Sequence, residues 1–305
     1  MTFNYLIQNP PIGDLEFKTL DLNNPPLVSF CIPTLNNERT IRECMESIQA
    51  QEYPRIEIVI VDGGSIDETT QIAKEYTNLI FEDKGPLGSA RQTSIEHSSG
   101  KILALFDSDI IIPHKMWLRN ALSYFNYSEK VSTVWPANTY PPQATPVCRL
   151  YFKHWRLIVN HRMTRAYGLF GGGNALFLRS CIETIGGVNR ALHWGEDFDW
   201  AKRLKENGYS VVFIDDPLYH DTMNSLKEFA RKQFVGAATF SQTGFGLMNM
   251  TLWDVIYEQY VIGVKGSIGG IIKERDFDWL LFPMLQSLKS LAYSYKFLVR
   301  MVKEC

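Results

Sequence analysis

Short runs of consecutive apolar residues recur through the first third of the chain, and polar segments with helical periodicity separate them. The runs are Leu27–Ile32, Ile56–Val61, Leu79–Phe81 and Ile102–Phe106, and Ser29 and Glu57 are their only polar residues. Strands that are apolar at nearly every position are typical of a sheet that is covered on both faces. Three intervening segments carry Ser/Thr-x-x-Glu/Gln sequences, which are typical of helix N-termini: Thr40–Glu43, Ser65–Glu68 and Ser89–Gln92. The alternation predicts βαβ units, and therefore an α/β fold with a mostly parallel central sheet flanked by helices.

The second half of the chain is less regular. A glycine-rich stretch, residues 171–174, precedes a short apolar run, and a helix is expected to begin near Gly195 and to end at Gly208. A strand, Val211–Ile214, follows, and from about Leu226 the pattern is helical and amphipathic. We therefore expect an N-terminal extension at residues 1–25, an α/β domain at residues 26–222 and a helical C-terminal region at residues 223–305.

Composition narrows the class of protein. The 305 residues are 45% hydrophobic and 21% charged, which is enough for a substantial core, and the net charge of −2 gives no indication of a nucleic-acid partner. The five cysteines are scattered and form no Cys-x-x-Cys pair, which argues against a zinc site or a disulfide framework and favours a reducing, cytoplasmic compartment. The N-terminal sequence lacks a signal-peptide pattern, and we expect no membrane span.

Polar residues follow three of the predicted strands, where ligands bind in parallel α/β sheets. They are Pro33-Thr34, Asp62-Gly63-Gly64 and Asp107-Ser108-Asp109. Two carboxylates spaced i, i+2 can bind one Mg²⁺ or Mn²⁺, which in turn can hold a diphosphate. A solvated turn is the alternative, because Asp is common in turns.

Three further features have both a structural and a chemical interpretation. Glu196 and Asp197 stand at a predicted helix start, where they could balance the helix dipole or supply a general base. His220 follows a strand and could be structural or a metal ligand. The glycines at 171–173 could form a turn or allow a ligand to approach the backbone.

Taken in order, several motifs resemble glycosyltransferase family 2 over about residues 27–220. They are Ile32–Glu38, Ile60–Thr69, Lys84–Gly85 with Ser89–Arg91, Phe106–Asp109, Gly172–Arg179, Ile185–Asn189 and Gly195–Leu204. The resemblance implies a GT-A fold and an inverting transfer of one sugar from a UDP- or GDP-sugar, with Mn²⁺ or Mg²⁺ as cofactor.

The resemblance also implies roles for individual residues. The metal would be bound by Asp107, Asp109 and His220, and the catalytic base would be Asp197 with Glu196 beside it. The nucleotide-sugar would contact Pro33, Thr34, Glu38, Asp62, Gly63, Lys84, Arg91, Asp107 and Ser108. The donor-sugar and acceptor pocket would include Gly172, Gly173, Asn174 and Trp194.

The chain departs from the family pattern in ways that bear on specificity. Many relatives have Asp-Asp-Gly-Ser where this chain has Asp62-Gly63-Gly64-Ser65, so the base of the nucleotide stays open. The Gln-x-x-Arg-Trp motif of processive synthases is absent, which favours addition of a single sugar. The Glu196-Asp197 pair favours an acceptor hydroxyl, on a glycan or a lipid-linked oligosaccharide.

The C-terminal segment repeats apolar residues at helical spacing between Trp279 and Val302, namely Leu281, Leu285, Leu288, Leu291, Tyr295, Leu298 and Val302. Lysines and an arginine are interleaved among them. Such a helix either lies in a membrane interface, which would make the protein peripheral on the cytoplasmic face, or packs on its own domain.

Two other functions share parts of this pattern: a sugar nucleotidyltransferase, and a nucleotide-sugar-binding protein without catalysis. A dinucleotide-dependent oxidoreductase is disfavoured, because the turn after the first strand reads Pro-Thr-Leu-Asn-Asn-Glu and not Gly-x-Gly-x-x-Gly.

Overall fold

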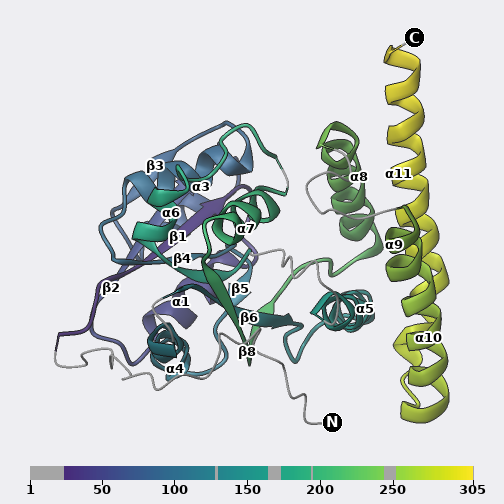
Figure 1. The fold of residues 1–305 in the computed structure, drawn as a ribbon, viewed down its shortest axis with the longest axis horizontal. Helices are drawn as coiled ribbons and strands as arrows, with labels where there is room; N and C mark the ends of the chain where they lie inside the picture. The colour runs from purple at the N-terminus through teal and green to yellow at the C-terminus, as the bar shows by residue number, and fades with distance from the viewer. Residues whose placement is uncertain (1–23, 128–129, 164–172, 194, 244–251, 305) are drawn as a thin grey trace. The chain divides into compact units, whose positions relative to one another are not determined.

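The computed structural model describes residues 24–127, 130–163, 173–193, 195–243 and 252–304. The chain forms two compact units (Figure 1). The sheet unit comprises residues 1–138 and 171–220, and the helical unit comprises residues 139–170 and 221–305. Residues 139–170 thus belong to the helical unit together with residues 221–305, and the expected boundary at residue 222 stays a prediction.

An eight-stranded sheet runs through the sheet unit, with the strand order β3-β2-β1-β4-β7-β6-β8-β5. The strands are β1 (Val28–Thr34), β2 (Ile56–Asp62), β3 (Ile80–Glu82), β4 (Ile102–Leu105), β5 (Ile110–Ile111), β6 (Val131–Thr139), β7 (Ala175–Leu178) and β8 (Ser210–His220). The pairs β3-β2, β2-β1 and β1-β4 are parallel, as the βαβ pattern predicts. Beyond β4 the pairs β4-β7, β7-β6 and β8-β5 are antiparallel, so the sheet is mixed. The α/β fold with a helical C-terminal segment is confirmed.

Helices cover both faces of this sheet. Figure 1 shows α3 (Leu87–Glu96), α6 (Arg179–Thr184) and α7 (Glu196–Glu206) over one face, and α1 (Ile41–Gln49) and α4 (Trp117–Ser123) over the other. The shorter helices are α2 (Thr69–Ala73) and η1 (Tyr124–Tyr127). Successive side chains of a strand point to opposite faces of the sheet. Because β1 is buried at every position, both faces of the sheet are covered there.

The core on the α1 and α4 side is aromatic at its centre. Phe30 of β1 meets Phe106 edge to face with a centroid distance of 5.4 Å, and Phe106 meets Trp117 at 6.0 Å. Phe106 is the residue directly before the Asp107–Asp109 turn, and it is fully buried. This packing fixes the point at which the chain leaves β4.

The three expected capping boxes are not formed. Thr40 precedes α1 but makes no side-chain cap hydrogen bond, and Ser89 lies inside α3, which begins at Leu87. The Ser65 hydroxyl donates to Asp62 over 2.5 Å, and α2 begins only at Thr69. The local sequence thus predicts the helices approximately, but the hydroxyl groups bond to other polar side chains three to six residues away and not to helix N-termini.

The helical unit consists of α5 (Pro146–Met163), α8 (Leu226–Thr243), α9 (Leu252–Ile256), the π-helical η3 (Tyr257–Val261), α10 (Ile262–Gly269), the π-helical η4 (Gly270–Glu274), η5 (Phe277–Leu281) and α11 (Phe282–Glu304). Its main apolar cluster contains Val147, Leu150, Met223, Phe229, Trp279, Phe282 and Leu285. The sequence pattern had not indicated α5 or β6.

The apolar stripe expected along the C-terminal helix is divided between core and surface. Leu285 is buried, and Leu281 and Leu288 pack against the same cluster. Further along α11, Leu291 and Leu298 are exposed. Val302 lies outside the residues whose side chains are described. Part of the stripe therefore packs on its own unit, and no helix in the described part of the chain is long and apolar enough to cross a membrane.

Candidate active site

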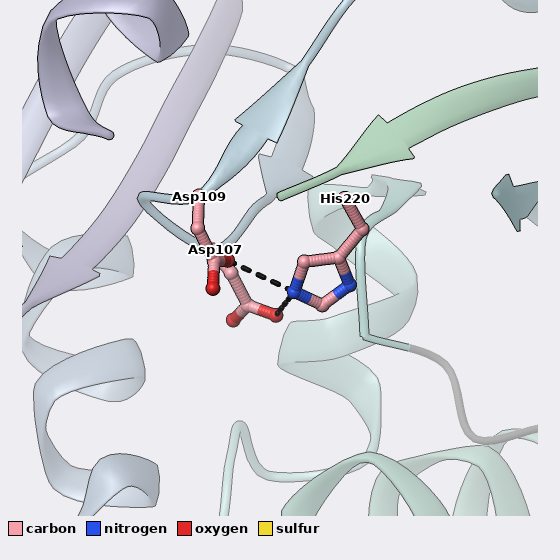
Figure 2. Close-up of side chains that lie close together, drawn as sticks. All are labelled: Asp107, Asp109 and His220. Atoms are coloured by element: carbon pink, nitrogen blue, oxygen red, sulfur yellow. Dashed lines mark ion pairs between the residues drawn. The ribbon is translucent and has the colours of Figure 1, made fainter. Parts of the chain in front are cut away.

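Two aspartates and a histidine meet at the end of the sheet (Figure 2). Asp107 and Asp109 lie in the turn between β4 and β5, and His220 ends β8. The antiparallel register of β5 and β8 places Ile110 opposite His220, which brings the imidazole to the turn. His220 Nε2 lies 2.9 Å from Asp109 Oδ1 and 4.0 Å from Asp107 Oδ2.

The donor atoms of this cluster suit a divalent cation. One ligand atom from each of Asp107, Asp109 and His220 lies within 4.8 Å of the other two. Carboxylate oxygens with one imidazole nitrogen are ligands that Mn²⁺ and Mg²⁺ accept, and Asp109 is only 8% exposed. The three residues expected to bind a metal are thus brought together, and they could hold one ion between them.

The carboxamide of Asn174 bonds to Asp107 through both its nitrogen and its oxygen. Its Nδ2 donates to Asp107 Oδ2 over 3.1 Å, and its Oδ1 accepts from the Asp107 backbone N–H over 2.7 Å. Asn174 is buried and has a φ of 66°, a left-handed conformation that Asn tolerates better than most side chains. We expected Asn174 in the sugar pocket. In the structure its side chain orients the Asp107 carboxylate, and its contact with a sugar stays a prediction.

Arg91 links the aspartate turn to the start of α7. Its Nη2 donates to Asp107 over 2.7 Å and its Nε donates to Glu196 over 3.0 Å. The guanidinium lies 5.8 Å from the ring centroid of Trp200. Arg91 is 2% exposed, and its Nη1 makes no hydrogen bond with the described residues. Although burial opposes the charge, the carboxylates of Asp107 and Glu196 raise the pKa of Arg91, so it remains a fixed cation.

The resemblance implies that Arg91 lies near the nucleoside, and this stays a prediction. In the structure its guanidinium lies between Asp107 and Glu196. The positions of Arg91, Asp107 and Glu196 along the chain do not predict these contacts, because α3 and α7 come together only in the folded sheet unit.

Glu196 and Asp197 open α7 after Gly195, which has a φ of 78°. Asp197 Oδ1 accepts from the Phe198 N–H over 2.9 Å, and its Oδ2 accepts from the Gly173 N–H over 3.3 Å. A carboxylate held by two backbone donors has a defined direction, which a proton acceptor requires.

The environment of this pair shifts both carboxyl groups. Burial and then the charge of Glu196 raise the pKa of Asp197 to about 7, against the opposing charge of Arg91. Burial likewise raises the pKa of Glu196, and Arg91 counteracts it. An aspartate that titrates near neutral pH is suited to accept a proton from a hydroxyl group.

The loops after β1 and β2 form a second polar region. The parallel register sets Thr34 opposite Asp62, and the Gly63 N–H donates to the Thr34 carbonyl over 2.8 Å. Asp62 Oδ2 accepts from the backbone N–H groups of Gly64 and Ser65 over 3.0 and 2.9 Å. The Thr34 Oγ1 is buried and has no hydrogen-bond partner among the described residues.

The remaining expected nucleotide contacts lie around these loops. Glu38 accepts from the Glu68 N–H over 3.1 Å, which ties the loop after β1 to the start of α2. Lys84 pairs with Glu82 over 3.0 Å, and its methylene chain lies against Gly64, where a Cβ would come within 2.9 Å of Lys84 Cε. Ser108 is buried between the two aspartates.

The other expected site residues are placed as follows. Pro33 lies within β1 opposite Val61. A Cβ on Gly173 would lie 3.9 Å from both Arg91 Nη2 and Asp197 Oδ2. Gly172 and Trp194 lie outside the described residues. Sequence reasoning missed the aromatic support of Trp200 beneath Arg91. Trp200 follows Glu196 by four residues, so the two side chains lie on the same face of α7, and this spacing could have indicated that Trp200 lies near the site.

The chain is similar in sequence to proteins named as glycosyltransferases. The profile described as "Glycosyl transferase family 2" matches residues 29–186. Glycosyltransferase AglE of Haloferax volcanii is 31% identical over 224 residues, which are 68% of this chain and 71% of that protein. The putative glycosyltransferase EpsH of Bacillus subtilis is 38% identical over 218 residues, which are 64% of this chain and 60% of that protein.

Solved structures share the fold. The mannosyltransferase PcManGT of Pyrobaculum calidifontis, solved with GDP-Man and Mn²⁺, superposes with a TM-score of 0.62 at 18% identity, covering 94% of this chain and 91% of that one. S. aureus TarS 1-349, solved with UDP-GlcNAc, gives a TM-score of 0.50 at 17% identity, covering 91% and 92%. With the α/β sheet and the Asp107–Asp109 turn, these matches show that the chain belongs to glycosyl transferase family 2 and is a glycosyltransferase with a GT-A fold.

Proposed function

We propose that this glycosyltransferase transfers a single sugar from a UDP- or GDP-sugar to an acceptor hydroxyl with inversion, using Mn²⁺ or Mg²⁺. The observation that carries the proposal is Arg91, which bonds to Asp107 of the metal cluster and to Glu196 beside Asp197. One buried side chain thereby connects the group that would bind the leaving diphosphate with the group that would accept the proton.

The reaction would be a direct displacement at the anomeric carbon. The acceptor oxygen forms the new glycosidic bond while the bond from the anomeric carbon to the diphosphate breaks, and the hydroxyl proton passes to Asp197. A divalent cation, when bound, neutralises charge on the departing diphosphate. Asp107, Asp109 and His220 would hold that cation, and Asn174 keeps Asp107 in position.

The geometry around Gly173 supports an acceptor at Asp197. The Gly173 backbone orients the Asp197 carboxylate, and the missing side chain leaves room between Asp197 and Arg91. A hydroxyl needs to come within hydrogen-bond reach of the base, about 2.6–3.2 Å, and a backbone without Cβ permits that approach. We assign the acceptor and donor sugar to this space, on a glycan or a lipid-linked oligosaccharide.

The loops after β1 and β2 support nucleoside binding. Thr34 and Asp62 face each other at the carboxyl ends of two parallel strands, the usual ligand edge of an α/β sheet. Glu38, Gly63 and Lys84 line the same loops. The buried, unpartnered Thr34 hydroxyl would gain a hydrogen bond from a bound nucleoside.

The test is release of nucleoside diphosphate from a panel of UDP- and GDP-sugars. It is run with Mn²⁺ or EDTA, with soluble and lipid-linked acceptors, for the wild type, Asp197→Asn and Glu206→Gln. Glu206 is the exposed last residue of the same helix, so its variant is the matched control. We expect Mn²⁺-dependent release in the wild type and the control, and its loss in Asp197→Asn. Release of pyrophosphate would identify a nucleotidyltransferase, and donor binding without turnover on any acceptor would identify a binding protein.

A further inference from the structure

A helical hairpin in the helical unit exposes large apolar side chains at its turn. Its first arm runs through α9, η3, α10 and η4, and its second arm is η5 followed by α11. Figure 1 shows α10 beside the start of α11. We define the hairpin tip as the four exposed large apolar residues nearest the turn, which are 56%, 72%, 65% and 63% exposed: Ile268, Ile272, Phe277 and Leu280.

The turn itself is firmly built. Arg275 adopts a left-handed conformation with a φ of 53° and reverses the chain. The Asp276 N–H donates to the Gly270 carbonyl over 2.9 Å, and the Asp276 carboxylate accepts from the Asp278 N–H over 3.2 Å to begin η5. Contacts between η4 and η5 hold the two arms together.

Large aromatic side chains fill the space between the arms. Gly270 lies against Trp279 and Gly263 against Phe282, where an added Cβ would come within 2.1 and 2.0 Å of the rings. Trp279 and Phe282 are only 4% and 6% exposed. The hairpin therefore has its own packed interior, and the outward direction of the tip residues is a consequence of that packing.

Positive charge surrounds the tip. Lys265, Lys273 and Arg275 are exposed, and Glu274 is the exposed carboxylate between them. The nearby acidic residues are neutralised within the unit, since Asp276 pairs with Lys153 over 2.5 Å, and Asp278 with Arg149 over 2.7 Å and with Lys153. The surface presented at the turn is thus aliphatic and aromatic with a cationic rim.

We propose that the hairpin tip inserts into the headgroup region of an anionic lipid bilayer and anchors the protein there. Apolar side chains rimmed by Lys and Arg are the pattern of an interfacial membrane contact, because the apolar groups leave water while the cations meet lipid phosphates. Exposed Ile, Phe and Leu together are unfavourable in water, and a cationic rim complements an anionic surface. The anchor goes beyond the proposed transfer reaction and involves none of its residues.

Flotation of the full chain with lipid vesicles tests the proposal. Vesicles are phosphatidylcholine alone or phosphatidylcholine with phosphatidylglycerol. We expect the wild type to float with the anionic vesicles and less in high salt. The double variant Ile272→Glu/Phe277→Glu should bind at least roughly tenfold more weakly, because two charges enter the interface. Ile66→Glu places one such charge at an isoleucine that is 94% exposed in the sheet unit, and it should float like the wild type.

A second variant keeps the apolar tip and removes the rim. Lys273→Gln/Arg275→Asn deletes two cations, and Asn tolerates the left-handed backbone at position 275. Its affinity for vesicles that contain phosphatidylglycerol should fall by roughly tenfold or more, so that it no longer prefers them to phosphatidylcholine alone. This variant tests the anchor even where the glutamate pair disturbs folding, which circular dichroism would reveal.

Three outcomes would overturn the anchor. In the first, the glutamate pair and the wild type float equally. In the second, the wild type binds neither kind of vesicle. In the third, sedimentation reveals a dimer that the glutamate pair dissociates while the wild type fails to float, which would make the tip a contact between copies of the chain. Because flotation needs no donor or acceptor, failure of the proposed reaction leaves this result unaffected.

Discussion

The guanidinium of Arg91 donates to the carboxylate of Asp107 over 2.7 Å, with Arg91 only 2% exposed. The same side chain bonds to the buried Glu196. A cation in this position offsets the two carboxylates, which would otherwise repel each other at low dielectric. It therefore positions the Asp107 carboxylate and sets the charge next to Asp197.

Arg91→Met should lower the free energy of unfolding by about 3 kcal/mol, because removing one partner of a buried ion pair leaves the other charge uncompensated. Urea unfolding monitored by circular dichroism measures this. The double variant Arg91→Met/Glu196→Gln removes both charges, so neither is left without its partner. Its loss of unfolding free energy should therefore be smaller than the sum of the losses in the two single variants. Additive losses would contradict a direct energetic coupling of Arg91 with Glu196.

The pH dependence of transfer should report Asp197. Because a base acts in its deprotonated form and the pKa of Asp197 is about 7, kcat/KM should rise with pH through about 7 and then level off. Asp197→Asn should reduce kcat by roughly 100-fold to 10,000-fold and abolish this limb. The profile is measured with saturating Mn²⁺. An unchanged limb in the variant would assign the titration to another group.

The Asp197 carboxyl group should also affect stability, but whereas kcat/KM rises with pH, its contribution to the free energy of unfolding should fall with pH. Its pKa is raised from 3.8 to about 7 on folding, so the folded state retains a proton that the unfolded state has lost between these values. Its contribution to stability is present at acid pH and is lost as the pH rises through about 7. The Tm of Asp197→Asn relative to the wild type should therefore be higher at pH 8 than at pH 5. Comparing the two proteins at each pH cancels the other titrating groups.

Metal binding should depend on Asp109 and not on another His–Asp pair of the sheet unit. Mn²⁺ should raise the Tm of the wild type in the presence of UDP or GDP, because a ligand that binds only the folded state stabilises it. Asp109→Asn should lose this increase. Asp216→Asn is the control, since Asp216 pairs with His114 over 3.0 Å at the surface. Equal responses of the two variants would place the metal elsewhere.

Gly173→Ala should separate folding from transfer. The added Cβ would lie 3.9 Å from Arg91 Nη2 and from Asp197 Oδ2, which is ordinary contact, so the Tm should stay within a few degrees of the wild type. The methyl group would occupy the space that we assign to the acceptor, so the acceptor KM should rise or kcat fall by roughly tenfold, as expected for crowding of a reacting hydroxyl. Steady-state kinetics with varied acceptor measures this. Unchanged kinetics would place the acceptor elsewhere.

The pattern of apolar and polar residues was enough to predict the parallel half of the sheet and the loops that follow its strands. The run Ile102–Phe106 is apolar at every position, which is typical of a strand buried on both faces. Because ligands bind beyond the carboxyl ends of such strands, the sequence predicts Asp62, Asp107 and Asp109 as residues of the ligand edge. The family motifs then indicated the kind of enzyme.

Contacts between side chains that are distant along the chain become visible only in the folded protein. Arg91, Asn174 and Glu196 come from separate elements, and no local pattern encodes their contacts with one another or with Asp107. The C-terminal apolar stripe shows the same limit. Leu285 and Leu291 both belong to the stripe by their helical spacing, but Leu285 is buried and Leu291 is exposed. Helical periodicity identifies an apolar face, but only the neighbouring helices determine how much of that face is covered.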